Sequence, residues 1–155
     1  MKAQIQNSLF MVSEIKVSYL PKFKASERPH ISVSKDAYNI LINNWDQGRI
    51  EFNEQCKMLL LNRANKVLGI FEVSTGGQAG TVLDPKLIFA TALKASAASF
   101  IISHNHPSGS LKPSEADISI TRKLVEAGKL LDLFVLDHII ITKEGYYSFG
   151  DEGLI

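Results

Sequence analysis

The chain has 155 residues, 45% of them hydrophobic and 21% charged, which predicts a single globular domain able to bury a sizeable core. Its formal net charge is only +1, which argues against a protein that wraps nucleic acid through the phosphates. One cysteine, Cys56, excludes an internal disulfide and a cysteine-rich zinc site, and no apolar run suits a secretory leader or a membrane span.

The first 30 residues differ in pattern from the rest of the chain. Residues 14–20 alternate apolar and polar side chains as a strand does, whereas residues 21–30 are basic, contain proline and predict irregular structure. We therefore divide the chain into an N-terminal arm, 1–30, and a domain, 31–155. The arm is expected to pack on the domain or on a partner chain, so a homodimer is one arrangement it allows.

Helical periodicity appears in three segments of the domain. Apolar residues recur at helical spacing over 32–45, 83–97 and about 113–131. Ser34 is expected to be the N-cap of the first helix. Asp84 is expected to cap the second, with Pro85 at its first helical position, which is a strong helix start.

Strands are predicted between these helices. Residues 54–74 alternate as two antiparallel strands around a turn at 62–65 and lead into a glycine loop at 74–80. Residues 98–103 form a continuous apolar run, which suits a buried strand, and residues 133–149 predict a hairpin. This order predicts an α/β fold in which one sheet is flanked by helices.

Two of the four histidines lie one residue apart, directly after the buried strand. If the strand continues through His104 and His106, both side chains point to the same side, with β-carbons roughly 6 to 7 Å apart. Asp117 follows on the first turn of the next helix, and the turn-rich link between them can fold that turn back. Two imidazoles and a carboxylate form a three-ligand set that leaves a zinc ion one open position, the catalytic arrangement.

A second interpretation needs no metal. Ser114 and Asp117 have the spacing of a capping box, which by itself explains both residues. From spacing alone the metal site and the helix cap stay open as alternatives. His138 lies in an apolar strand beside Asp137, and a buried histidine paired with a neighbouring polar group is favoured there over a role behind a metal ligand.

The spacing of His104, His106, Ser114 and Asp117 resembles the signature of the JAB/MPN metalloprotease domains, also called JAMM. Segments 59–69, 104–117, 135–142 and 146–149 are similar to the bacterial RadC-like branch of these domains, and the likeness covers about 31–155. The helix-hairpin-helix region of longer RadC proteins is not among the segments matched, so the chain looks like the short form. The resemblance implies a JAB/MPN fold of the cytidine-deaminase-like type, with His104, His106 and Asp117 as zinc ligands.

The resemblance also implies catalytic roles. In these domains a glutamate just before a central strand acts as general base, and the matching position is Glu54, with Glu51 and Glu72 as competitors. Ser114 would donate a hydrogen bond to the developing oxyanion, a role that we expect to compete with helix capping. The implied activity is zinc-dependent hydrolysis of a peptide or isopeptide bond in a protein or peptide substrate.

A different class of function stays open. The RadC likeness also allows an accessory protein in DNA repair or DNA metabolism whose zinc site is not catalytic. The position of Glu54 discriminates between the two, because only a hydrolase needs a base beside the metal. Direct nucleic-acid binding is not expected from the charge, and we expect a cytoplasmic protein with no membrane segment.

Overall fold

The computed structural model describes residues 12–16, 18–76 and 83–155, and within these residues five strands form one mixed sheet in the order β2-β1-β3-β4-β5. The strands are β1 (Gln55–Leu61), β2 (Val67–Thr75), β3 (Ser99–Asn105), β4 (Phe134–Ile141) and β5 (Tyr146–Ser148). β3 pairs in parallel with β4, and the other neighbours are antiparallel. The helices are α1 (Ser34–Asn43), α2 (Pro85–Lys94) and α3 (Glu115–Leu130), preceded by a 3-10 turn at Ala25–Glu27.

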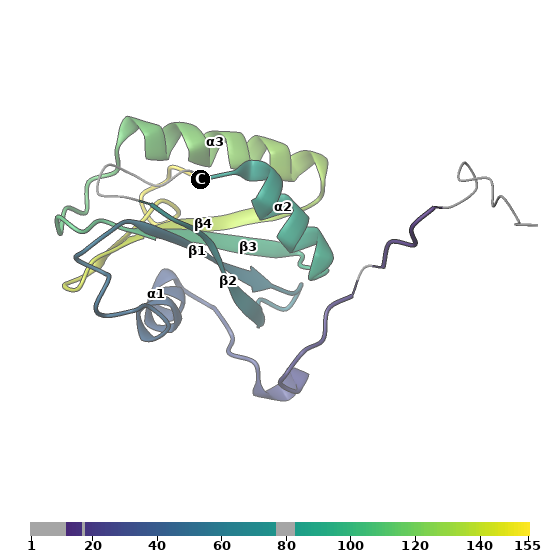
Figure 1. Ribbon diagram of the computed structural model, residues 1–155. Helices are drawn as coiled ribbons and strands as arrows, with labels where there is room; N and C mark the ends of the chain where they lie inside the picture. Colours follow the sequence, from purple (N-terminus) through teal and green to yellow (C-terminus); the bar gives the residue numbers. More distant parts are fainter. Residues whose placement is uncertain (1–11, 17, 77–82) are drawn as a thin grey trace, which may run out of the picture.

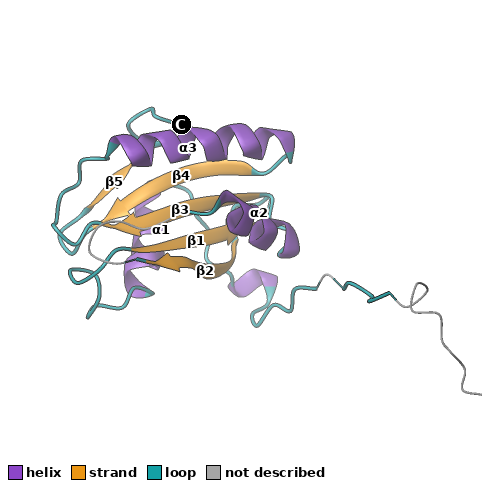
Figure 2. Ribbon diagram, turned by 45° about the horizontal axis from the view of Figure 1, so that its top comes forward, coloured by secondary structure: helices purple, strands orange, loops and turns teal. Residues whose placement is uncertain are grey.

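The helices form layers on both faces of the sheet. α2 and α3 cover one face and α1 covers the other, as Figures 1 and 2 show. β1 and β3 lie in the middle of the sheet and are buried along their whole length, which explains their nearly continuous apolar sequences. The predicted α/β fold, a sheet flanked by helices, is therefore confirmed.

Each face of the sheet has its own apolar core. Met58, Phe100 and Ile102 pack toward α2 and α3, whereas Leu59 and Ile101 pack toward α1. Neighbouring residues of a strand point to opposite faces, so β1 and β3 supply both cores at once. This alternation continues to the end of β3 and decides which polar side chains meet there.

The predicted start of α2 is confirmed, whereas the predicted cap of α1 is not. The Asp84 side chain accepts a hydrogen bond from the backbone N–H of Lys86, with Pro85 at the first position of α2. The predicted cap of α1 was wrong by one residue, because Val33 is the N-cap and Ser34 is already helical. The Ser34 hydroxyl contacts the Tyr146 hydroxyl and the Asp151 carboxylate instead.

The predicted strand at 14–20 was also wrong, since none of its described residues is in a strand. Alternation supplies a pleated surface, but a strand also needs a neighbouring strand for its backbone hydrogen bonds. Residues 12–16 run away from the sheet in Figures 1 and 2, whereas the later part of the arm lies against β2: the Tyr19 hydroxyl donates to the carbonyl of Leu68, and the carbonyl of Pro29 accepts from the N–H of Val67. Most of the predicted glycine loop, 77–80, lies outside the described residues.

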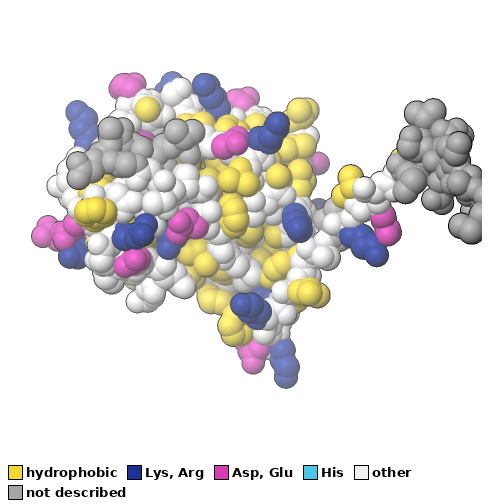
Figure 3. Space-filling model, in the orientation of Figure 1, with side chains coloured by type: hydrophobic (Ala, Val, Ile, Leu, Met, Phe, Trp, Pro, Cys, Tyr) yellow, Lys and Arg dark blue, Asp and Glu magenta, His cyan; other side chains and the backbone are white. Residues whose placement is uncertain are grey.

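The surface shows no separation of charges on the face in Figure 3, where basic and acidic side chains are interspersed around a central apolar area. Across residues 12–16, 18–76 and 83–155, every helix is too short or too polar to cross a bilayer.

Candidate metal centre

The centre lies where β1 begins and β3 ends. Because these strands are antiparallel, Cys56 near the start of β1 lies opposite His104 near the end of β3. Glu54 precedes β1 directly, and the first turn of α3 brings Asp117 to the same edge of the sheet. Three separate parts of the chain thus place polar side chains at one point.

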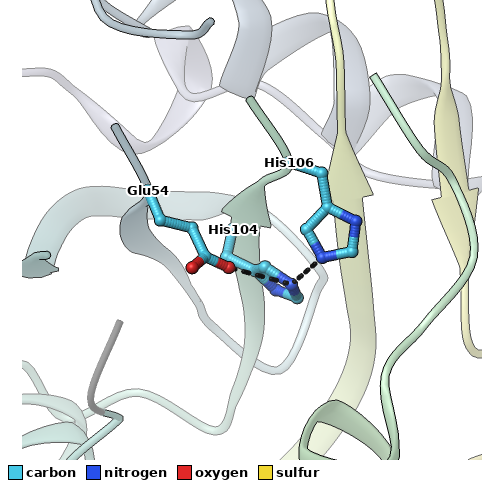
Figure 4. A group of neighbouring side chains, drawn as sticks. All are labelled: Glu54, His104 and His106. Carbon is cyan, nitrogen blue, oxygen red and sulfur yellow. Dashed lines mark hydrogen bonds and ion pairs between the residues drawn. The ribbon is translucent and has the colours of Figure 1, made fainter. Parts of the chain in front are cut away.

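Short distances connect the two histidines with the two carboxylates. The Nε2 atoms of His104 and His106 are 3.0 Å apart. Asp117 Oδ1 lies 3.3 Å from His104 Nε2, and Asp117 Oδ2 lies 3.7 Å from His106 Nε2. Glu54 Oε1 is 3.9 Å from His104 Nε2, and Figure 4 shows its carboxylate directed at that ring.

This set of donor atoms fits a divalent metal ion. Two donors on one tetrahedral zinc, at about 2.0 to 2.1 Å each, lie roughly 3.3 to 3.4 Å apart. The distance between the two Nε2 atoms and the two distances from Asp117 to the histidines, 3.0, 3.3 and 3.7 Å, scatter around that value. Ligand atoms of Glu54, His104 and His106 also lie within 4.8 Å of one another, so these three residues are close enough to bind a metal ion as well.

The charges of the centre are strongly coupled. Burial raises the pKa of the Asp117 carboxyl, but the close contacts with His104 and His106 outweigh this effect and hold that pKa far below its usual range. The hydrogen bond with Asp117 raises the pKa of His106. Asp117 is therefore an anion at neutral pH, the form that binds a metal ion.

Ser114 is the N-cap of α3. Its Oγ accepts a hydrogen bond from the backbone N–H of Asp117, at 3.1 Å, and Asp117 Oδ2 accepts one from the N–H of Ser114, at 2.7 Å. The capping box is real, and the same carboxylate also faces the two histidines. The cap uses a lone pair of Ser114 Oγ and leaves the hydroxyl proton available. The expected competition between helix capping and donation to an oxyanion therefore does not arise.

The three candidate glutamates lie in different environments. Glu54 is mostly buried and faces His104. Glu51 is exposed and pairs with Lys143 at 2.6 Å. Glu72 is half exposed and accepts a hydrogen bond from the hydroxyl of Thr75. The structure thus brings only Glu54, of these three, to the histidines.

Asn105, which the sequence interpretation did not single out, holds the segment that carries Glu54. Its side chain is fully buried and accepts a hydrogen bond from the N–H of Gln55, at 2.7 Å. Its amide group donates to the carbonyls of Ile50 and Asn53. Alternation along β3 is the signal that could have found it, because a polar residue between two inward-facing histidines must point to the opposite, equally buried face.

His138 lies behind His104 and is fully buried. Its Nε2 is 2.8 Å from His104 Nδ1, and its Nδ1 is 2.6 Å from the Thr121 hydroxyl oxygen. His138 is a buried histidine paired with a polar group, as the favoured interpretation expected, but that group is Thr121; Asp137 meets the backbone N–H of His138 and not its ring. The contact with His104 also places His138 behind a candidate ligand, so the two interpretations do not exclude each other.

Comparison with known proteins agrees with this arrangement. The family model described as the RadC-like JAB domain matches residues 31–154. The chain belongs to the RadC-like JAB domain family. The matched residues of this RadC-like domain include all four side chains at the centre and the whole sheet.

Two relatives show how far the RadC-like similarity extends. A UPF0758 protein of Flavobacterium johnsoniae is 46% identical over 124 residues, which cover 80% of this chain and 53% of the relative. A UPF0758 protein of Methanosarcina mazei is 40% identical over 136 residues, or 88% of this chain and 58% of the relative. The chain thus spans about half the length of these relatives.

Proposed function

We propose that this RadC-like domain is a zinc-dependent hydrolase that cleaves a peptide or isopeptide bond. His104, His106 and Asp117 would hold the ion. The observation that carries the proposal is the position of Glu54, a carboxylate from a separate segment that lies 3.9 Å from His104 Nε2. A purely structural ion needs ligands but no further base beside them.

Each residue then has a distinct role in the proposed reaction. When bound, zinc lowers the pKa of a coordinated water toward about 7 and polarises the scissile carbonyl. Glu54 would accept a proton from the attacking water and later deliver it to the leaving amine nitrogen. Ser114 would donate a hydrogen bond from its hydroxyl to the oxyanion, because the helix cap uses only a lone pair of that hydroxyl.

The chemistry of the centre defines the substrate only by class. Hydrolysis by an activated water with a carboxylate base suits amides and other acyl bonds alike. The resemblance to JAMM metalloproteases favours peptide or isopeptide bonds among them. A protein or peptide substrate is therefore part of the proposal, and an accessory role in DNA metabolism remains the alternative.

The decisive experiment is the Glu54→Gln exchange in zinc-loaded protein. A degenerate peptide library that includes lysine-linked isopeptides is incubated with each variant, and new termini are detected by mass spectrometry. We expect the wild type to cleave, and Glu54→Gln to keep its zinc but lose about 10²–10⁴-fold in rate.

The control is Glu51→Gln, which removes an exposed carboxylate three residues away and should cleave like the wild type. Equal rates for Glu54→Gln and wild type would overturn the role of Glu54. If zinc-loaded wild type cleaved nothing in the library, the non-catalytic alternative would be favoured.

A further inference from the structure

His138 occupies the second position in a buried line of hydrogen bonds that starts and ends at candidate metal ligands. The line runs from His104 Nδ1 to His138 Nε2, at 2.8 Å, and from His138 Nδ1 to Thr121 Oγ1, at 2.6 Å. Thr121 Oγ1 then lies 2.6 Å from the backbone carbonyl of Asp117. The ring of Phe149 stacks on His138 with centroids 4.6 Å apart, so the flat face of the imidazole is packed as well as its two nitrogens being hydrogen-bonded.

The carbonyl at the end of this line decides where the protons are. A carbonyl oxygen only accepts, so the single hydroxyl proton of Thr121 must lie on the contact with Asp117. Thr121 Oγ1 is then an acceptor toward His138, and His138 Nδ1 must carry a proton. If the hydroxyl proton pointed to His138 instead, lone pairs of Thr121 Oγ1 and of the Asp117 carbonyl would face each other at 2.6 Å inside a buried site.

The second ring nitrogen of His138 follows from its surroundings. The hydrogen bonds that its ring makes within the described residues go to a hydroxyl and to another imidazole, so none pairs it with a carboxylate. A buried cation without such a partner is costly. His138 is therefore a neutral imidazole whose Nε2 has a bare lone pair.

His104 must then be the donor in its contact with His138, because two bare nitrogens do not attract each other at 2.8 Å. We propose that Thr121 and His138 are positioning residues that fix His104 in its Nδ1-protonated tautomer, so that its Nε2 presents a lone pair to a divalent metal ion. The inference rests on the metal site of the proposed function but needs no hydrolytic activity.

The same geometry holds for the second histidine by a simpler route. His106 Nδ1 lies 2.8 Å from the carbonyl of Ser110, which only accepts, so this nitrogen is also a donor. Both histidines thus turn their Nε2 atoms to the centre, where they lie 3.0 Å apart; without an ion this contact needs one proton, which a divalent metal ion would replace. A backbone carbonyl orients one ligand, and a second histidine held by a hydroxyl orients the other.

The tautomers can be measured directly. Histidine-labelled full chain, with and without zinc, is studied by long-range proton–nitrogen correlation spectroscopy, in which protonated and bare ring nitrogens have distinct shifts. We expect His138 to be neutral with its proton on Nδ1, and His104 to carry a proton on Nδ1. A proton on Nε2 of His138 in the metal-free protein would overturn the proposal, whatever the protein hydrolyses.

A matched pair of variants tests the consequence for metal binding. Thr121→Val keeps the shape of the side chain but removes the hydroxyl, whereas Thr121→Ser keeps the hydroxyl. Loss of a hydrogen-bond partner behind a ligand typically costs about 10–100-fold in metal affinity. We expect that loss in Thr121→Val and wild-type affinity in Thr121→Ser, read from zinc titration calorimetry and the visible spectrum of bound cobalt.

A second pair covers the case in which Thr121→Val does not fold. His138→Leu removes the acceptor for His104, whereas the side-chain oxygen of His138→Gln can replace it. Circular dichroism reports folding in each case. Folded Thr121→Val or folded His138→Leu that binds cobalt with wild-type affinity and spectrum would overturn the positioning role.

Discussion

The two faces of β3 use the same strand end for different purposes. Toward α3, His104 directs its ring at Asp117 and His106, close enough to share a metal ion with them. Toward α1, Asn105 directs its amide at the backbone around Glu54 and binds no titratable group. Neighbouring residues of a pleated strand would therefore have different roles: His104 would bind the proposed ion, and Asn105 would set the distance of the proposed base.

The two faces also differ in what a substitution would leave behind. On the α3 face, the polar atoms meet one another and are arranged for an ion. On the α1 face, the Asn105 side chain satisfies one backbone N–H and two backbone carbonyls at a buried site. Loss of a ligand should therefore abolish metal binding, whereas loss of Asn105 should release the segment before β1 and leave the ligands in place.

The largest effect is expected for ligand removal on the α3 face. Purified wild-type protein should hold about one equivalent of zinc, and His104→Ala or Asp117→Ala should hold almost none, because each removes one of three ligands. Elemental analysis after dialysis measures this. Glu115→Ala, which removes an exposed carboxylate from the same helical turn, is the control and should keep its zinc. Stoichiometric zinc in both ligand variants would refute the ligand assignment.

The next largest effect compares two helix caps. Ser114→Ala and Asp84→Ala each remove an N-cap and should each lower the free energy of unfolding by about 1 kcal/mol. Only Ser114 lies at the centre, so only its variant should also slow hydrolysis, by about 10²–10³-fold. Denaturant unfolding and peptide cleavage are measured on the same samples. Equal cleavage rates for the two variants would reduce Ser114 to a helix cap.

A smaller effect is expected from the α1 face. Asn105→Ala leaves buried backbone groups unpaired, which should cost about 1–3 kcal/mol of the free energy of unfolding. A misplacement of the base by about 1 Å can slow the reaction about 10²-fold. Zinc affinity should stay at the wild-type value, since no ligand is changed. A loss of zinc affinity as large as the loss of rate would contradict separate roles for the two faces of β3.

Ser103→Ala is the matched control for that variant. Ser103 is equally buried and lies on the same face of β3, but its hydroxyl donates to the carbonyl of Ile139 on β4 and not to the segment that carries Glu54. Its loss should destabilise the fold without slowing cleavage. An equal loss of cleavage rate in both variants would show that general destabilisation of β3, and not displacement of Glu54, lowers the rate.

The smallest effect concerns nucleic acid. Because basic and acidic side chains nearly balance, duplex DNA should bind no tighter than about 10⁻⁴ M at physiological salt. Fluorescence titration with a labelled duplex measures this. Submicromolar affinity would move the accessory role in DNA metabolism ahead of hydrolysis and direct attention to the basic residues of the arm.

Local rules predicted the parts of this structure that depend on near neighbours. Asp84 and Pro85 mark the start of α2, and alternation alone places His104 and His106 on one side of β3. These features depend on backbone geometry within a few residues, so sequence spacing is enough to predict them.

Features that depend on distant partners were not predictable in the same way. The described residues of the alternating segment 14–20 form no strand, and Ser34 contacts Tyr146 and Asp151 instead of capping its helix. His138 finds His104 and Thr121 only because β4 pairs with β3 beneath α3. Such pairings follow from the order of strands in the sheet, which spacing along the chain does not contain.

The most direct test of the account is the crystal structure of the zinc-loaded chain, with the ion located by its anomalous scattering. We predict one zinc bound by Nε2 of His104, Nε2 of His106 and a carboxylate oxygen of Asp117, at about 2.0 to 2.2 Å each. Glu54 should lie beyond bonding distance, next to the open position. A zinc ion bound by Glu54 in place of Asp117 would contradict the account, because the proposed base would then be a ligand.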